Sequence, residues 1–228
     1  MPLPTSDRRR EDARPVQEIT MTNTCSFITL AVASVRIAAN QHGTHSAMLH
    51  LAALAVLIAE RDSGGTWTFS LKRHAVAAGD REDTLLLWAL NTLPESGIVL
   101  GWQLVDQVMA PLLDAATTGD PELGWAFLER LTRLVTAPSV DLAVHHGGVG
   151  APPLAEIAAG HGIDLPVTDS TAVESAWGFG DRAWLRDHVE AEAVAVWGLW
   201  LAESNGTAGN ASAAFHAWRS GGSNTRSL

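Results

Sequence analysis

Two long apolar runs near the start of the chain constrain its fold more than any other feature. Residues 26–35 read SFITLAVASV and are dense in β-branched side chains, and residues 46–60 read SAMLHLAALAVLIAE. The first run is typical of a strand buried on both faces, because apolar residues occupy both odd and even positions. The second has the Ala and Leu content of a helix but also suits a central strand.

The segment that follows the second run favours the strand interpretation. Asp62-Ser63-Gly64-Gly65 is a turn signal, and the next residues, TWTFSLKR, alternate between polar and apolar. Alternation with a period of two is typical of a half-buried strand, and a turn between two strands makes a hairpin. We therefore expect residues 46–60 to be largely strand.

The rest of the chain alternates between helical patterns and short apolar segments. Helices are predicted at 80–93, 106–116, 121–135, 153–159 and 181–204, and strands at 97–102 and 139–144. The order is three strands, a helix, a strand, helices, a strand and helices. This order predicts an α/β fold with a mixed sheet between layers of helices.

Length and local composition indicate one domain with polar arms. A chain of 228 residues is long enough for one sizeable core and short for two typical domains. Residues 1–25 and 205–228 are rich in polar residues, Gly or Pro, so we expect a flexible N-terminal arm, a folded domain over 26–204 and a flexible C-terminal tail. Phe215 and Trp218 offer the tail a means of docking a short helix onto the body.

Charge and cysteine content exclude several classes of protein. The chain has 15 Lys and Arg against 25 Asp and Glu, a formal charge of -10, which argues against coating nucleic acid through bulk positive charge while leaving room for a local basic groove. A single cysteine, Cys25, excludes an internal disulfide. No run resembles a signal peptide or a lipid-facing helix, so we expect a soluble, cytoplasmic protein with no membrane partner.

Common catalytic signatures do not occur in the sequence. It has no phosphate-binding loop ending in Lys-Ser or Lys-Thr, no G-x-S-x-G, no H-E-x-x-H and no Rossmann glycine fingerprint. His145-His146, beside Gly147 and Gly148, is a pattern that also occurs at metal-binding or phosphate-binding sites. Adjacent residues of a strand point to opposite faces, however, and an ordinary loop is the favoured interpretation there.

Three segments, taken in order, carry a resemblance to a known family. Residues 28–35 read ITLAVASV, residues 101–106 read GWQLVD, and residues 188–201 read HVEAEAVAVWGLWL. This order resembles the DEDD superfamily of 3′-to-5′ exonucleases, especially the predicted exonucleases similar to the proofreading part of family B polymerases. The resemblance covers roughly residues 26–203.

The resemblance implies a fold, an activity and a set of site residues. It implies a ribonuclease-H-like mixed five-stranded sheet flanked by helices, and two-metal hydrolysis at a single-stranded nucleic-acid 3′ end with Mg²⁺ or Mn²⁺. Ala31 and Ala33 stand where the family has the Asp and Glu of its first motif. Asp106 corresponds to the second-motif carboxylate, with spacing about one residue short. Glu192 falls on the third-motif metal position, and His188 on the position that takes a proton from water.

Each of these residues also has an ordinary interpretation. The alanines suit a normal core strand, Asp106 stands where a helix N-cap is expected, and His188 with Glu192 also fits a solvated i, i+4 pair. Two alanines at alternate positions fit both natural loss and a deliberate inactivating substitution.

Three hypotheses for the whole chain follow. The first is an exonuclease-type domain that is inactive or impaired in this form, with metal binding weak or absent. The second is a non-catalytic module on the same fold that binds nucleic acid or protein. The third is an unrelated α/β protein.

Overall fold

Strand β1, the first apolar run, is the central strand of a mixed sheet. The computed structural model describes residues 25–37, 48–204 and 208–221, and the predicted N-terminal arm lies outside them apart from Cys25. The strands are β1 (Cys25–Ile37), β2 (Met48–Arg61), β3 (Trp67–Ala75), β4 (Ile98–Gly101) and β5 (Ser139–Asp141). The described residues place them in one five-stranded sheet in the order β3-β2-β1-β4-β5.

Strand β1 separates the antiparallel part of the sheet from the parallel part. Strands β1, β2 and β3 are antiparallel, with Ala31 opposite Ala55, whereas β4 runs parallel to β1 and β5 runs parallel to β4. The predicted hairpin and the strand assignment of residues 46–60 are confirmed, because β2 spans Met48–Arg61. The predicted α/β class is also confirmed, and the mixed five-stranded sheet is compatible with a ribonuclease-H-like fold.

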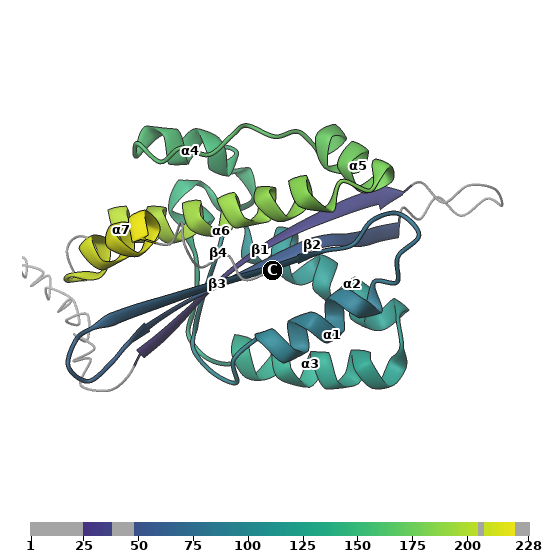
Figure 1. The fold of residues 1–228 in the computed structure, drawn as a ribbon, viewed down its shortest axis with the longest axis horizontal. Helices are drawn as coiled ribbons and strands as arrows, with labels where there is room; N and C mark the ends of the chain where they lie inside the picture. The colour runs from purple at the N-terminus through teal and green to yellow at the C-terminus, as the bar shows by residue number, and fades with distance from the viewer. Residues whose placement is uncertain (1–24, 38–47, 205–207, 222–228) are drawn as a thin grey trace, which may run out of the picture.

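Helices cover both faces of the sheet (Figure 1). Helices α1, α2 and α3 lie below it in this view, and α4, α5, α6 and α7 lie above it. Their bounds are α1 (Asp83–Thr92), α2 (Ala110–Thr118), α3 (Pro121–Val135), α4 (Leu154–Gly160), α5 (Ser170–Phe179), α6 (Arg182–Glu203) and α7 (Ala211–Gly221). Shorter helices are the π-helix η1 (Leu104–Met109) and the 3₁₀ helices η2 (Leu142–His146) and η3 (Gly148–Gly150).

The alternation of β1 divides the core into two parts. Phe27, Ala31 and Ala33 face α6 and belong to the core above the sheet. Ile28 and Leu30 belong to the core below it, with α1, α2 and α3. Burial on both faces explains why the strand is apolar at successive positions.

Part of the segment that was expected to be a flexible C-terminal tail is a helix packed on the body. Residues Ala211–Gly221 form α7, which contacts β3, and Phe215 is only 5% exposed. The ring centroids of Phe69 and Phe215 are 5.3 Å apart, and those of Phe69 and Trp218 are 5.6 Å apart. Aromatic packing therefore holds α7 against β3. The contacts are made by Phe215 and Trp218, the two side chains that the sequence indicated as able to dock the tail.

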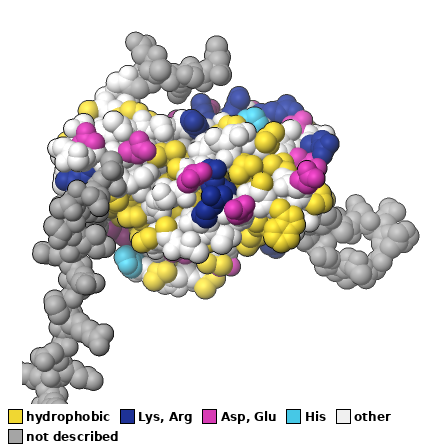
Figure 2. Space-filling view, turned by 90° about the horizontal axis from the view of Figure 1, so that it is seen from below, with side chains coloured by type: hydrophobic (Ala, Val, Ile, Leu, Met, Phe, Trp, Pro, Cys, Tyr) yellow, Lys and Arg dark blue, Asp and Glu magenta, His cyan; other side chains and the backbone are white. Residues whose placement is uncertain are grey.

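The layer of α1, α2 and α3 presents a mixed outer surface. Figure 2 views the molecule from this side and shows hydrophobic side chains beside positive and negative ones. Leu87 on α1, Leu113 on α2 and Trp125 on α3 are exposed, Trp125 by 76%. Among the described residues, no helix has the length and apolar character needed to cross a bilayer.

Gly124 permits the close approach of α3 to α2. A Cβ atom built at Gly124 would lie 2.1 Å from the carbonyl oxygen of Ala116, which is closer than real contacts allow. We expect Gly124→Ala to lower the free energy of unfolding by about 1–3 kcal/mol, because the two helices must move apart.

A matched control is available on helix α5. Gly178 is helical, and a Cβ there would meet nothing within 4 Å. Gly178→Ala should raise stability by up to about 1 kcal/mol through helix propensity. Urea unfolding of both variants checks the pair, and equal stabilities would contradict the packing argument.

Candidate functional site

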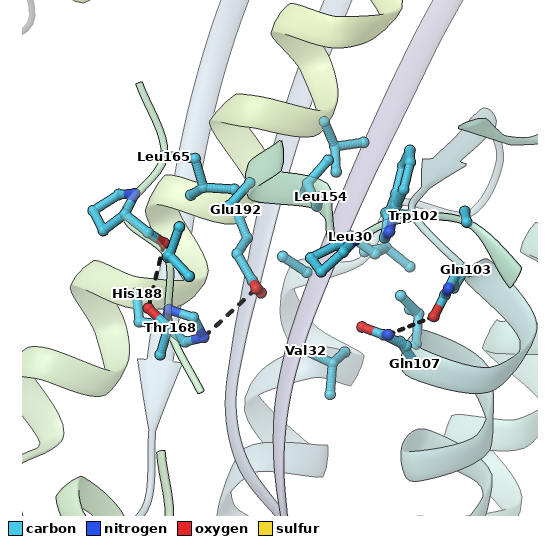
Figure 3. A pocket seen from close by; sticks show the side chains of 18 residues that line it. Leu30, Val32, Trp102, Gln103, Gln107, Leu154, Leu165, Thr168, His188 and Glu192 are labelled. Carbon is cyan, nitrogen blue, oxygen red and sulfur yellow. Dashed lines mark hydrogen bonds and ion pairs between the residues drawn. The ribbon is translucent and has the colours of Figure 1, made fainter. Parts of the chain in front are cut away.

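A pocket of about 310 Å³ lies between β1, the end of β4 and helix α6 (Figure 3). Strand β1 contributes three consecutive residues to its lining, and the segments before α4 and α5 close its other sides. The lining includes Leu30, Ala31, Val32, Trp102, Gln103, Gln107, Leu154, Leu165, Thr168, His188 and Glu192. The volume is at the lower end of the range for small-molecule sites.

Helix α6 supplies the two ionisable side chains of the lining. His188 and Glu192 are one helical turn apart, so both project from the same side of α6. The Nε2 atom of His188 is 3.6 Å from Oε1 of Glu192, and Figure 3 shows the carboxyl group directed into the pocket. Trp184, one turn earlier, stacks on the imidazole with 5.2 Å between ring centroids. The helix and this stacking together fix the position of the pair.

Burial shifts the protonation of both groups toward their neutral forms. It raises the pKa of Glu192 to about 7 and lowers the pKa of the His188 imidazole. A carboxyl group with this pKa gains and loses its proton near neutral pH, beside an imidazole that is largely neutral there. The pair is therefore able to exchange a proton with a bound molecule.

Two carboxamides form the opposite side of the pocket. Gln103 adopts the left-handed backbone region, with φ of 45°, immediately before the π-helix η1. The Asp141 carboxylate accepts a hydrogen bond from the backbone N–H of Leu104 at 2.9 Å and anchors this turn. Gln107 Nε2 then donates to Gln103 Oε1 at 2.5 Å. A positive φ at a residue other than glycine and a π-helix are both features that cluster at functional sites.

The structure brings together three of the five residues singled out in the sequence. Ala31, His188 and Glu192 line the same pocket. Ala33 is buried on the same face of β1, 4% exposed, but is not part of the lining.

Asp106 is placed differently from the expectation. It is exposed and outside the lining, while its neighbour Gln107 is part of it. The helix begins at Leu104, with Gln103 as its N-cap, so Asp106 is not the N-cap either. Because η1 starts earlier than the predicted helix, it rotates Asp106 outward. Among the described residues, no three of His, Cys, Asp and Glu are grouped to hold a metal ion.

The paired histidines lie in a short helix, at a place where an ordinary loop was the favoured interpretation. Strand β5 is shorter than predicted and ends at Asp141, whose carboxylate accepts a hydrogen bond from Ala143 N–H and caps η2. His145 Nδ1 and His146 Nε2 both contact the Glu203 carboxylate, at 3.3 and 2.6 Å. The two side chains therefore join η2 to the end of α6.

Sequence reasoning missed the carboxamides, Trp102 and the loop before α5. The π-helix has no sequence signal of its own, and the left-handed conformation of Gln103 occurs at a residue that rarely adopts it. Helix α5 did have a signal. Asp169 caps it by accepting from Ala172 N–H, and Gly180 ends it with φ of 78°.

Neither a scan against models of protein families nor a search of curated proteins finds a match for this chain. Interpretation of the pocket consequently depends on its own geometry and chemistry.

The raised pKa of Glu192 predicts a pH dependence of stability. Between pH 4.5 and about 7, Glu192 holds its proton more strongly in the folded protein than in the unfolded chain, so its contribution to the free energy of unfolding should fall as pH rises through this window. The lowered pKa of His188 acts in the opposite direction, so the Glu192 contribution is the part that a Glu192 variant removes. The Glu192 side chain is 29% exposed, so water lessens the penalty and we expect a loss of about 1–3 kcal/mol.

Urea unfolding at pH 5 and pH 8 measures this difference. Glu192→Gln should remove this contribution and be the more stable protein at pH 8. Glu190→Gln, on the same helix but paired with Arg73 outside the pocket, should retain it. An unchanged pH dependence in Glu192→Gln would contradict the assignment.

Proposed function

We propose that this chain is a non-cleaving domain of the exonuclease type, whose pocket binds a single-stranded nucleic-acid 3′ end without hydrolysing it. The observation that carries the proposal is that Ala31 lines the same pocket as His188 and Glu192, although Ala31 is far from both in the sequence. These are the first-motif and third-motif positions of the family that the sequence resembles. The mixed sheet, with β1 at its centre, is compatible with the same fold.

The residues of the pocket do not fit a pair of divalent ions. Mg²⁺ and Mn²⁺ favour carboxylate oxygens, and two-metal hydrolysis needs several carboxylates around one phosphodiester. Glu192 is the single carboxyl group that the described residues give the lining, because alanine stands at the first-motif positions and Asp106 lies outside. We therefore assign no hydrolytic step to the protein in this form.

The charge of the pocket also sets the strength of binding. The described part of the chain contributes no Lys or Arg side chain to the lining, and the chain as a whole carries a formal charge of -10. Phosphate contacts normally provide much of the affinity for nucleic acid and make it dependent on salt. Binding through this pocket should be modest in strength and only weakly dependent on salt concentration.

A labelled single-stranded oligonucleotide with Mg²⁺ or Mn²⁺ tests the proposal. The chain itself should release no nucleotide. The triple variant Ala31→Asp/Ala33→Glu/Gln107→Asp returns carboxylates to the first motif and adds one on η1, and it should release nucleotides from the 3′ end. A gain of about 10⁴-fold corresponds to about 5 kcal/mol of transition-state stabilisation.

The controls separate a wrong assignment from a misfolded variant. Circular dichroism and thermal unfolding establish that the triple variant is folded, since two of its substitutions are at buried positions. Adding Glu192→Gln to the triple variant should abolish the gain. A folded triple variant with no nuclease activity would contradict the exonuclease-type assignment, and rapid cleavage by the unmodified chain would contradict the absence of catalysis.

A further inference from the structure

The ionisable groups of the pocket exclude an anionic ligand as its preferred occupant. Among the residues that the structure describes, His188 and Glu192 are the only titratable side chains that line it, and neither Lys nor Arg takes part. Burial lowers the pKa of the imidazole, so it provides little positive charge at neutral pH. A phosphate group in the pocket would lose its hydration and meet no cation. The pocket suits an uncharged molecule.

The hydrogen-bonding groups face one another across the pocket. Glu192 lies on the α6 side and the two carboxamides lie on the η1 side (Figure 3). The bond from Gln107 Nε2 uses the oxygen of Gln103, which leaves the Gln103 amide N–H groups and the Gln107 oxygen available. A ligand between them meets an acceptor on one side and both a donor and an acceptor on the other.

The remaining lining is apolar and includes a flat ring. Leu30, Val32, Leu154 and Leu165 surround the polar groups, and Trp102 adds an indole beside Gln103. The Trp102 ring is positioned by His146, with 5.6 Å between centroids. Apolar walls, an aromatic ring and a few polar groups are the combination that holds planar heterocycles.

We propose that the pocket binds the uncharged base of the terminal nucleotide and selects a base of the guanine type, in which a ring N–H lies between an amino group and a carbonyl. This inference rests on the proposed function, because it takes the nucleic-acid end as the source of the base. The phosphate and sugar stay at the mouth of the pocket, where they gain little.

The hydrogen-bonding groups of guanine match those of the pocket. A carboxylate accepts two hydrogen bonds side by side, and guanine offers its N1–H and an N2–H in that arrangement. The carboxamides on the opposite side face the other edge of the base, where N7 and the second lone pair of O6 accept from a carboxamide N–H. Adenine places an acceptor, N1, where guanine has a donor, so it would face the Glu192 carboxylate with like polarity.

The same contact predicts the direction of pH dependence. Guanine donates to the ionised form of Glu192, whose pKa is about 7, and His188 is the one other titratable group that faces it from the described lining. Affinity should therefore rise by roughly tenfold between pH 6 and pH 8 as the ionised fraction grows.

Isothermal titration calorimetry with free nucleosides tests the proposal. Guanosine should bind at least about tenfold more tightly than adenosine, and guanosine 5′-monophosphate no more tightly than guanosine. Glu192→Gln should weaken guanosine binding by about 10- to 100-fold, since it removes a charge-assisted pair of hydrogen bonds. Glu190→Gln, outside the pocket, should leave guanosine binding unchanged.

Distinct results would overturn the inference. Tenfold tighter binding of the monophosphate would identify a phosphate site, and equal binding of guanosine and adenosine would remove the base selectivity. Full guanosine affinity in a folded Glu192→Gln protein would place the nucleoside elsewhere.

The nuclease assay with the triple variant distinguishes a wrong base assignment from a wrong proposed function. If the triple variant cleaves but the chain does not bind guanosine, the base assignment alone is wrong. If guanosine binds but the folded triple variant is inert, the exonuclease-type assignment is wrong and the nucleoside site stands.

Discussion

The requirement to bury β1 on both faces determines the arrangement of the whole molecule. A strand with apolar side chains at successive positions is stable only between two covering layers. Helices α1, α2 and α3 form one layer and α4–α7 the other, and side chains of β1 contribute to both cores. The pocket lies where this burial is incomplete: Leu30, Ala31 and Val32 belong to the central strand, yet all three reach the pocket lining. The site is thus a local gap in the packing around the central strand.

Small side chains on that strand have a direct bearing on the chemistry. Alanine at position 31 leaves space beside Glu192, and apolar neighbours of the carboxyl group disfavour its ionised form. A second carboxylate at this point would add charge where the present protein has none. The described lining is therefore largely apolar with a single acid in it, which is a different kind of site from a metal centre.

Elements with strong periodicity or turn signals could be predicted from the sequence, and those set by side-chain capping or unusual backbone geometry could not. The hairpin of β2 and β3 followed from the Gly-containing turn and the alternation after it. Strand β5 is shorter than predicted because the Asp141 side chain caps a 3₁₀ turn. The helical spacing of His188 and Glu192 placed both on one side of α6. The roles of Gln103 and Gln107 could not be predicted, because a left-handed residue and a π-helix bring them to the pocket. Both features are local departures from ideal backbone geometry.

The packing of α7 on β3 has a consequence for how the chain acquires its structure during synthesis. Phe69 is made early, but its ring contacts Trp197, Phe215 and Trp218, which belong to the last two helices. Contacts between such distant parts of a sequence are slow to form, and apolar strand surface left open promotes aggregation. In a nascent chain, the part of β3 that packs on α7 therefore stays uncovered until α7 has left the ribosome.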